Sequence, residues 1–321
     1  MRGPTASARH RAALVALSVA TVSSNVGFVL FKSSVLAHQQ YAVGESSWFV
    51  AAHDLAPRFL LGVFLLALLF GGRVLQLTRT EWRQAAFMAV TSFVGCMLQL
   101  DGLQYTSAAT TSFLTQFYVV LIPLWWALLH RERPDWRVPV ACVLVLAGVA
   151  IIARVDWRTF TIGRGEAEVL LGAVCFSFLL VSLNWPAFAG NRAERTSAGM
   201  FLLEGLLFAA VSMLVCREPA NLVAPFAAPG WVALMVASTV FGTIGPFVML
   251  NHWQRFITAT EAGVLYSFGP VIATVSEVFL PALISGWVGI TYANQPLTFT
   301  LVTGGALIIA ANGLLQLRPK R

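Results

Sequence analysis

Ten apolar stretches follow one another along the 321 residues of the chain, separated by short segments that carry most of its charge. A helix needs about 20 residues to cross the hydrocarbon core of a bilayer, which is about 30 Å thick. Only 11% of the residues are charged, against about 25% in soluble domains. The sequence therefore predicts an all-α membrane protein with ten transmembrane helices and no room for a soluble domain.

The expected spans form two sets of five. The first set covers residues 11–31, 55–75, 85–100, 107–129 and 138–153, and the second covers 169–189, 197–216, 231–251, 260–281 and 297–317. The basic start of the chain precedes a long apolar run without a small-residue cleavage site, so we expect an uncleaved first helix. In the second span, Arg58 and Arg73 leave too short an uncharged stretch between them. One of these arginines must therefore snorkel or line a cavity.

The fourth span of each set carries a row of small or polar residues at helical i, i+4 spacing. These rows are Ala108, Ser112 and Gln116 in the first set and Ala259, Gly263 and Ser267 in the second. Small residues in a row let helices approach closely in lipid. Because five is odd, the second set enters the membrane from the opposite side, which predicts two inverted five-helix repeats, a transporter signature. We expect the first repeat at residues 1–154, an outer linker at 155–166 and the second repeat at 167–321.

The distribution of basic residues predicts the orientation of the chain. With the N-terminus in the cytoplasm, fifteen of the 21 Lys and Arg residues fall on the inner side and six on the outer side. The outer six are Lys32, Arg58, Arg154, Arg158, Arg164 and Arg217. By the positive-inside rule both termini are cytoplasmic, and we expect a multi-pass protein of the cell (plasma) membrane.

The sequence gives no sign of nucleic-acid binding or of catalysis. The formal net charge is +7, but the basic residues are scattered over loops without interleaved aromatics, so no nucleic-acid partner is expected. The chain has no GxSxG, HExxH or phosphate-binding Gly-rich motif, which predicts no enzyme, no cofactor and no metal. The four cysteines, Cys96, Cys142, Cys175 and Cys216, match no metal motif and are expected to be small buried fillers.

Three acidic residues fall inside the expected spans, where each needs a cavity, a partner or an interface. Glu204 lies about 12 Å into its helix, near the middle of the bilayer. It is the favoured candidate for substrate binding or proton coupling, with a hydrogen bond to a neighbouring helix as the structural alternative. Glu261 lies in the first turn of its helix, where Thr258-x-x-Glu261 forms a capping box. Glu277, about 27 Å along the same helix, is expected near the outer surface in an exposed or interfacial position.

Several polar residues complete the candidate site. Gln116, Tyr266 and Ser267 fall near the midplane, where inverted-repeat transporters bind substrate; helix–helix hydrogen bonding is the alternative. Asn25 in the first span has the same two interpretations. Lys32 and Arg58 are expected at the outer ends of neighbouring helices, where they either snorkel to the surface or attract anionic groups.

Short fragments in a fixed order resemble a known family. The first half has Leu-Gln-Tyr-Thr-Ser-Ala-Ala-Thr at 103–110, then Glu-Arg-Pro at 132–134 and Ala-Gly-Val at 147–149, and the second half echoes these at 255–260, 269–271 and 295–298. This order resembles the drug/metabolite transporter superfamily, in its ten-helix EamA-type branch, over nearly the whole chain. Asn25, Lys32 and residues 58–61 also stand where that family has such residues. Two positions depart from it: Val119 stands where the family often has Pro, and Asn294-Gln295 replaces Gly-Glu. Before that pair, residues 282–293 are expected to form an outer interfacial segment or a lid.

The resemblance implies transport of a small polar or amphipathic metabolite, outward, by alternating access. The first four spans of each set would enclose a central cavity, and the fifth and tenth spans would be peripheral. The expected partners are a small-molecule substrate and the lipid bilayer, and a homodimer is left open. The alternative is a non-transporting membrane protein of the same fold, acting as a sensor or assembly partner, with an integral-membrane enzyme as a third option. A polar midplane cavity would favour the transporter, and a fully packed interior the sensor.

Overall fold

The computed structural model describes residues 6–131, 136–153, 162–183, 185–253, 256–257, 261 and 265–316, and within them every regular element is a helix. The first half contains α1 (Ala6–Gln39), α2 (Ser47–Phe70), η1 (Gly72–Leu75), α3 (Arg79–Tyr105), α4 (Ala108–Thr115), α5 (Phe117–His130) and α6 (Arg137–Ile152). The second half contains α7 (Arg164–Ser182), η2 (Pro186–Phe188), α8 (Ala193–Val215), η3 (Pro219–Leu222), η4 (Ala224–Ala227), α9 (Pro229–Ala237), η5 (Ser238–Ile244), α10 (Gly245–Trp253), α12 (Gly269–Val288) and α13 (Phe299–Gln316). The all-α fold class is confirmed.

The helices have the lengths and composition of membrane spans. Eight helical runs of the described residues are long and apolar enough to cross a membrane. Two shorter apolar helices, Arg137–Ile152 and Phe299–Leu315, lie at the expected fifth and tenth spans. Every expected span thus overlaps a described apolar helix, and the chain is a multi-pass membrane protein. The inverted relation of the two sets stays a prediction.

Helix α2 begins eight residues earlier than expected, at Ser47 rather than at residue 55. Ser46 caps the helix, because its hydroxyl accepts a hydrogen bond of 3.2 Å from the N–H of Phe49. The expected boundary was wrong because the polar residues His53 and Asp54 were assigned to a loop, whereas both are buried inside α2. Their polar atoms are bonded to other elements, so the helix can carry them into the bundle interior.

Helix α12 continues through Pro281 to Val288, so the expected outer segment at 282–293 is helical over its first half. A proline inside a helix leaves the carbonyl four residues earlier without its usual donor. Here that carbonyl belongs to Glu277, and the N–H of Gln295 donates to it at 3.1 Å. The side chain of Asn294 accepts the N–H of Ala282 at 2.9 Å. The returning segment 289–298 therefore satisfies the backbone that Pro281 disturbs.

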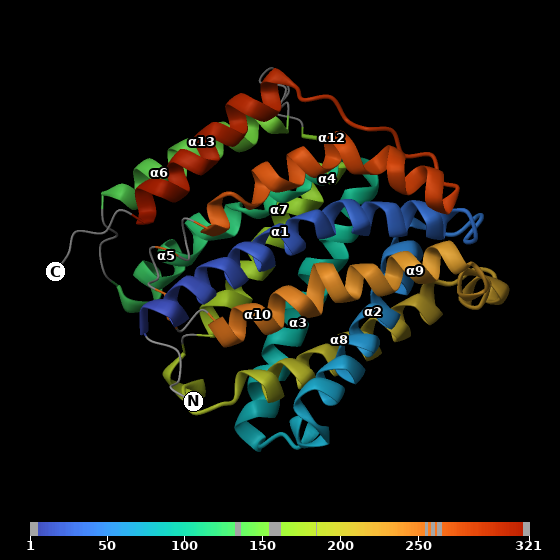
Figure 1. Cartoon of the computed structure of the whole chain (residues 1–321), viewed down its shortest axis with the longest axis horizontal. Helices are drawn as coiled ribbons and strands as arrows, with labels where there is room; N and C mark the ends of the chain where they lie inside the picture. Colours follow the sequence, from blue (N-terminus) through green and yellow to red (C-terminus); the bar gives the residue numbers. More distant parts are fainter. Residues whose placement is uncertain are drawn as a thin grey trace.

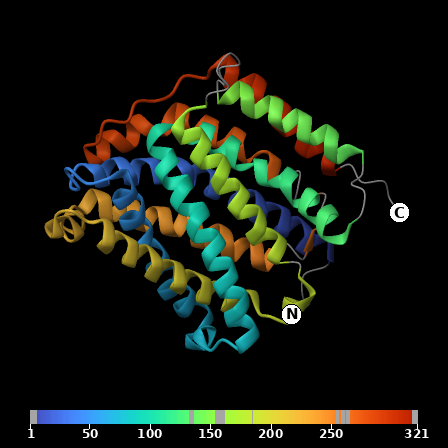
Figure 2. The ribbon, with the colours of Figure 1, turned by 180° about the vertical axis from the view of Figure 1, so that it is seen from behind.

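The helices of the two halves pack against each other. Helix α1 crosses the middle of the molecule between α12 and α10, and α6 lies beside α13 at one edge (Figure 1). The opposite view shows α3 alongside α7 (Figure 2), and α2 packs on α8. The peripheral position expected for the fifth and tenth spans is consistent with the pairing of α6 and α13.

Glycines allow the closest of these helix contacts. Helices α3 and α7 cross at Gly102 and Gly165, where a Cβ atom on either residue would lie 2.7 Å from the carbonyl oxygen of the other. On the other side of the bundle, a Cβ atom on Gly27 of α1 would lie 2.8 Å from the Cα of Gly242. Gly242 belongs to η5, a π-helical segment between α9 and α10. π-Helical turns are rare in proteins, and many of those that occur lie at functional sites.

Candidate functional site

Arg58 lies near the middle of α2, about 16 Å from the start of the helix at 1.5 Å per residue. Its side chain is only 6% exposed, and the guanidinium carbon lies 4.0 Å from the centre of the Phe31 ring on α1. One terminal nitrogen donates a 3.4 Å hydrogen bond to Thr243 of η5. The Nε and the other terminal nitrogen have no hydrogen-bond partner among the described residues. The expectation that Arg58 lies at an outer helix end was wrong, because α2 begins earlier than expected.

Asp54 stands one turn before Arg58 and partly balances its charge. One Asp54 carboxylate oxygen lies 3.7 Å from Arg58, and the other accepts hydrogen bonds from Ser34 at 2.5 Å and from the indole of Trp231 at 3.0 Å. Asp54 is fully buried. Asp54 was not among the predicted site residues, although the i, i+4 spacing of Asp54 and Arg58 on one helix was a usable signal.

Glu204 lies midway along α8 and is fully buried, with 0% of its surface exposed. No hydrogen bond of good geometry reaches either carboxylate oxygen within the described part of the chain. Ser92 and Cys96 of α3 are polar neighbours, and the Ser92 hydroxyl lies 3.6 Å from the Cys96 sulfur. A buried carboxylate without a partner is costly. Glu204 is therefore suited to exchange a proton or to contact a polar substrate.

Asn25 connects α1 to α4, which carries the first small-residue row, and to α12. The hydroxyl of Ser112 on α4 donates to the Asn25 side-chain oxygen at 3.0 Å, and the Asn25 amide donates to the carbonyl of Thr21 at 2.9 Å. On the opposite side, Asn25 packs so closely on Gly269 of α12 that a Cβ atom there would lie 2.6 Å from its amide nitrogen. Asn25 thus lies where α1, α4 and α12 meet.

The remaining midplane candidates lie around the junction of α4 and α5. Gln116 is half-buried at the break between the two helices. The buried hydroxyl of Tyr266 has no hydrogen-bond partner among the described residues, and Tyr118 of α5 is close enough to interact with it. Ser267 is buried next to Tyr266. Helices α4 and α12, next to these groups, pack on each other and on α1.

Lys32 and Glu277 both bind the connection between α3 and α4. The Lys32 ammonium donates to the carbonyls of Leu103, Gln104 and Thr106 at the end of α3. Glu277 accepts the backbone N–H groups of Ala108 and Ala109, each at 2.7 Å, at the start of α4.

Tyr292 adds a further bond to this carboxylate, since its hydroxyl donates to Glu277 at 2.9 Å. Burial, together with the charge of Glu277 and this hydrogen bond, raises the pKa of Tyr292, so its hydroxyl stays a donor. Glu277 is only 1% exposed, so its expected exposed or interfacial position was wrong. The segment 289–298 covers it instead.

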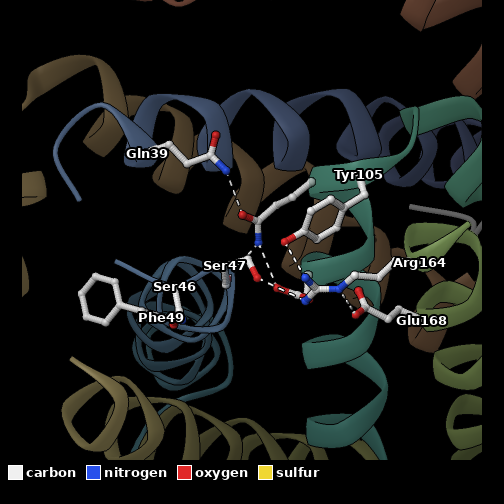
Figure 3. A network of polar contacts seen from close by, with 9 residues as sticks. Gln39, Ser46, Ser47, Phe49, Tyr105, Arg164 and Glu168 are labelled. Atoms are coloured by element: carbon white, nitrogen blue, oxygen red, sulfur yellow. Dashed lines mark hydrogen bonds and ion pairs between the residues drawn. The ribbon is translucent and has the colours of Figure 1, made fainter. Parts of the chain in front are cut away.

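The end of the bundle where α1 stops and α2 starts, named the α1–α2 end below, holds a cavity of about 400 Å³. Its lining includes Gln39, Glu45, Ser47, Gln104 and Tyr105. The amide of Gln39 donates to the side chain of Gln104 at 2.8 Å, and Gln104 in turn donates to the carbonyl of Ser47 at 2.9 Å (Figure 3).

Arg164, the first residue of α7, closes one side of this network. Its guanidinium donates to the hydroxyl of Tyr105 at 2.8 Å, to Glu168 at 2.7 Å and to Asp101 at 2.5 Å (Figure 3). The guanidinium also lies over the Tyr105 ring, 4.3 Å from its centre. Arg164 therefore fastens the start of α7 to the end of α3.

Some predicted elements of the site lie outside the described residues: Thr258 of the expected capping box, Ala259 and Gly263 of the second row, and the fragments at 132–134 and 255. Glu261 is described, and it lies 3.1 Å from the ring of His10 on α1.

Comparison with known proteins agrees with this architecture. Residues 11–154 match the EamA-like transporter family. The chain is 27% identical over 269 residues to an "Uncharacterized transporter YvbV" of Bacillus subtilis (strain 168). The aligned region covers 82% of this chain and 81% of that protein. These two matches support the resemblance to the drug/metabolite transporter superfamily that the sequence fragments show. A solved crystal structure also shares the fold, with a TM-score of 0.54 and 18% identity over 92% of this chain and 99% of that one.

The fold places the predicted site residues in separate groups. Asn25 and Ser112 are bonded to each other. Arg58 and Glu204 lie on the packed pair α2 and α8 and share Cys96 as a neighbour. Lys32 lies apart, at the α3–α4 connection. The residues that the sequence analysis missed, Asp54 and the histidines next to it, all lie at the α1–α2 end.

Proposed function

We propose that this protein exports a small metabolite across the plasma membrane by alternating access, with both termini in the cytoplasm and without catalysing a reaction. The observation that carries the proposal is the burial of Arg58 and Glu204 near the middle of their helices with polar atoms that no described group satisfies. A purely structural interior would supply hydrogen-bond partners for the Nε of Arg58 and for the carboxylate oxygens of Glu204, because each buried polar atom without one costs free energy. A polar substrate that enters between α2 and α8 would satisfy both.

The packing of the helices supports two inverted repeats. If α1 to α6 correspond in order to α7 to α13, with α9, η5 and α10 together matching α3, each major contact should have a counterpart. The contact of α3 with α7 then corresponds to that of α1 with α9, η5 and α10, and both occur. The contact of α1 with α12 corresponds to that of α7 with α4 and α5, which also occurs. The pairs α2–α8, α6–α13 and α4–α12 correspond to themselves.

The test begins with purified protein and a thermal-shift screen against amino acids, nucleosides, sugars and drugs, since a ligand that binds the folded state raises its apparent stability. A ligand found in this way is then followed across the membrane of proteoliposomes. We expect Glu204→Gln and Arg58→Lys to lose most of the transport. Matched controls are Glu194→Gln in the first turn of the same α8 and Arg73→Gln in η1, which should transport normally.

Two outcomes would overturn the proposal. Unchanged transport by both Glu204→Gln and Arg58→Lys would place the substrate elsewhere. Binding without any movement of the ligand across the vesicle membrane would favour the sensor alternative.

A further inference from the structure

Two histidines at the α1–α2 end form a chain of three polar contacts. His38 Nδ1 lies 3.2 Å from the carbonyl oxygen of Val50. His38 Nε2 lies 3.0 Å from His53 Nδ1, and His53 Nε2 lies 3.1 Å from the carbonyl oxygen of Leu222. Both side chains are buried, and the three contacts are direct. All four imidazole nitrogens are engaged.

Counting protons shows that two neutral rings cannot make these three contacts. Each contact needs one N–H group, because a carbonyl oxygen only accepts, and two bare ring nitrogens repel each other. A neutral imidazole has a single N–H, so two neutral rings supply two protons for three contacts. One contact would then bring two lone pairs within 3.2 Å of each other. A third proton turns all three contacts into hydrogen bonds.

We propose that His38 and His53 bind one shared proton, and that this proton fastens the α1–α2 end to the connection between α8 and α9. His38 belongs to α1, His53 and Val50 to α2, and Leu222 to η3 in that connection. The chain of bonds therefore links three segments from both halves of the protein.

One carboxylate next to the pair can offset part of its positive charge. Among the described residues this group is Asp54, next to His53 on α2, and beyond it lies Arg58, which shares that carboxylate. The Asp54 oxygen nearer Arg58 has no hydrogen-bond partner among the described residues. From α1 the neutral Ser34 binds Asp54, and from α9 Trp231 binds it and stacks on both imidazoles, with ring centres 5.3 and 6.0 Å away.

The proton makes the stability of the folded protein depend on pH in a defined direction. An unfolded imidazole loses its proton near pH 6.5, whereas the folded pair keeps one proton for its three bonds. Where the folded state holds more protons than the unfolded state, stability falls as the pH rises. The ratio of folded to unfolded protein should therefore fall by up to about tenfold per pH unit above pH 6.5, until the pair gives up its proton.

Nitrogen NMR on the full-length protein in lipid nanodiscs tests the proton count directly. The sample carries ¹⁵N-labelled histidine and the substitutions His10→Gln, His130→Gln and His252→Gln, so that only the pair gives side-chain signals. We expect three protonated nitrogens, one of them shared, at about pH 7. Two protonated nitrogens at that pH would overturn the proposal, and this measurement needs no change to the pair itself.

A second experiment compares thermal unfolding from about pH 6 to about pH 9. The wild-type midpoint should fall as the pH rises, and His38→Gln and His53→Gln should each remove this fall. His252→Gln, which replaces an exposed histidine, should keep the wild-type profile. The proposal fails if His38→Gln retains the wild-type dependence on pH.

Discussion

Lys32 and Glu277 bind the two sides of the same helix break, the cation at the end of α3 and the carboxylate at the start of α4. The last carbonyls and first N–H groups of helices have no partners within the helix. The helix dipoles favour a positive charge at the first place and a negative charge at the second. The two side chains, from α1 and α12, therefore hold the turn between α3 and α4 in place.

Glu277→Gln should destabilise the protein by about 1–3 kcal/mol, because the amide leaves at least one buried N–H of α4 without an acceptor. Tyr292→Phe removes one hydrogen bond to the same carboxylate and should cost less, about 1 kcal/mol. Thermal unfolding in detergent, followed by tryptophan fluorescence, ranks the two. A Glu277→Gln protein as stable as wild type would show that the carboxylate does not hold α4.

Alanine at two glycine positions should have opposite effects. Gly102→Ala places a Cβ atom 2.7 Å from the carbonyl oxygen of Gly165, and overpacking of this kind costs about 1–3 kcal/mol. At Gly286 of α12 nothing lies within 4 Å of an added Cβ atom. Gly286→Ala should therefore stabilise the helix by about 0.5–1 kcal/mol. Unfolding midpoints on opposite sides of the wild-type value confirm the close crossing of α3 and α7; a stable Gly102→Ala protein contradicts it.

The sequence was sufficient to predict the apolar helices and the position of Glu204 midway along its helix, because span positions follow from hydropathy and the position within a span follows from the helical rise. It failed for Glu277, since distance along a straight helix ignores what covers the helix end. Pro281 and the returning segment with Tyr292 and Gln295 enclose that end. The expected span began after Asp54, because a carboxylate was expected to lie outside the membrane. The donors to Asp54, Ser34 and Trp231, come from other helices, and only the tertiary fold brings them together.

The sequence also did not predict which helices pack against each other, although it contains one pattern that indicates a close helix contact. Gly95 and Gly102 on α3, and Gly165 and Gly172 on α7, are each seven residues apart and so lie on one face of their helices. Such a face predicts a close contact. It does not say which helix provides the other side, because that choice depends on the packing of the whole bundle.

Glu45, in the turn between α1 and α2, should make the protein sensitive to acid. Burial acts to raise its pKa, but hydrogen bonds from the N–H groups of Glu218 and Arg217 and from Asn221 outweigh it and hold the pKa below its ordinary value. A carboxylate with a lowered pKa stabilises the fold above its unfolded pKa, and this contribution is lost as the pH falls through the folded value. The wild-type midpoint should therefore fall more than that of Glu45→Gln between about pH 5 and about pH 3.

The matched control for Glu45 is Glu218→Gln, because Glu218 is exposed and contributes its backbone N–H, which the substitution keeps. This variant should follow the wild-type acid profile. If Glu45→Gln lost stability in acid as steeply as wild type, the turn would not depend on the Glu45 carboxylate.

Enlarging Ser112 should harm the protein more than enlarging a lipid-facing residue. Ser112 is 2% exposed and binds Asn25 between α1 and α4, so Ser112→Leu overpacks the site and removes a hydrogen bond, at about 1–3 kcal/mol. Leu146 of α6 is 55% exposed, and Leu146→Phe should be nearly neutral. Yield and unfolding midpoint of the purified variants measure the difference. Equal losses in both variants would contradict the placement of the α4 face.

The orientation of the chain can be tested with single cysteines in a background without the four native ones. Val43 between α1 and α2 and Val223 between η3 and η4 are both largely exposed. The basic-residue bias and the proposed inverted repeat together predict that both lie outside the cell. A membrane-impermeant maleimide added to intact cells should therefore label Val43→Cys and Val223→Cys. It should not label Leu75→Cys in η1, which is exposed and is expected to face the cytoplasm. Labelling of Leu75→Cys alone would reverse the orientation. Labelling of Val43→Cys without Val223→Cys would contradict the inverted repeat, because the second set of helices would then not place its α8–α9 connection on the outer side.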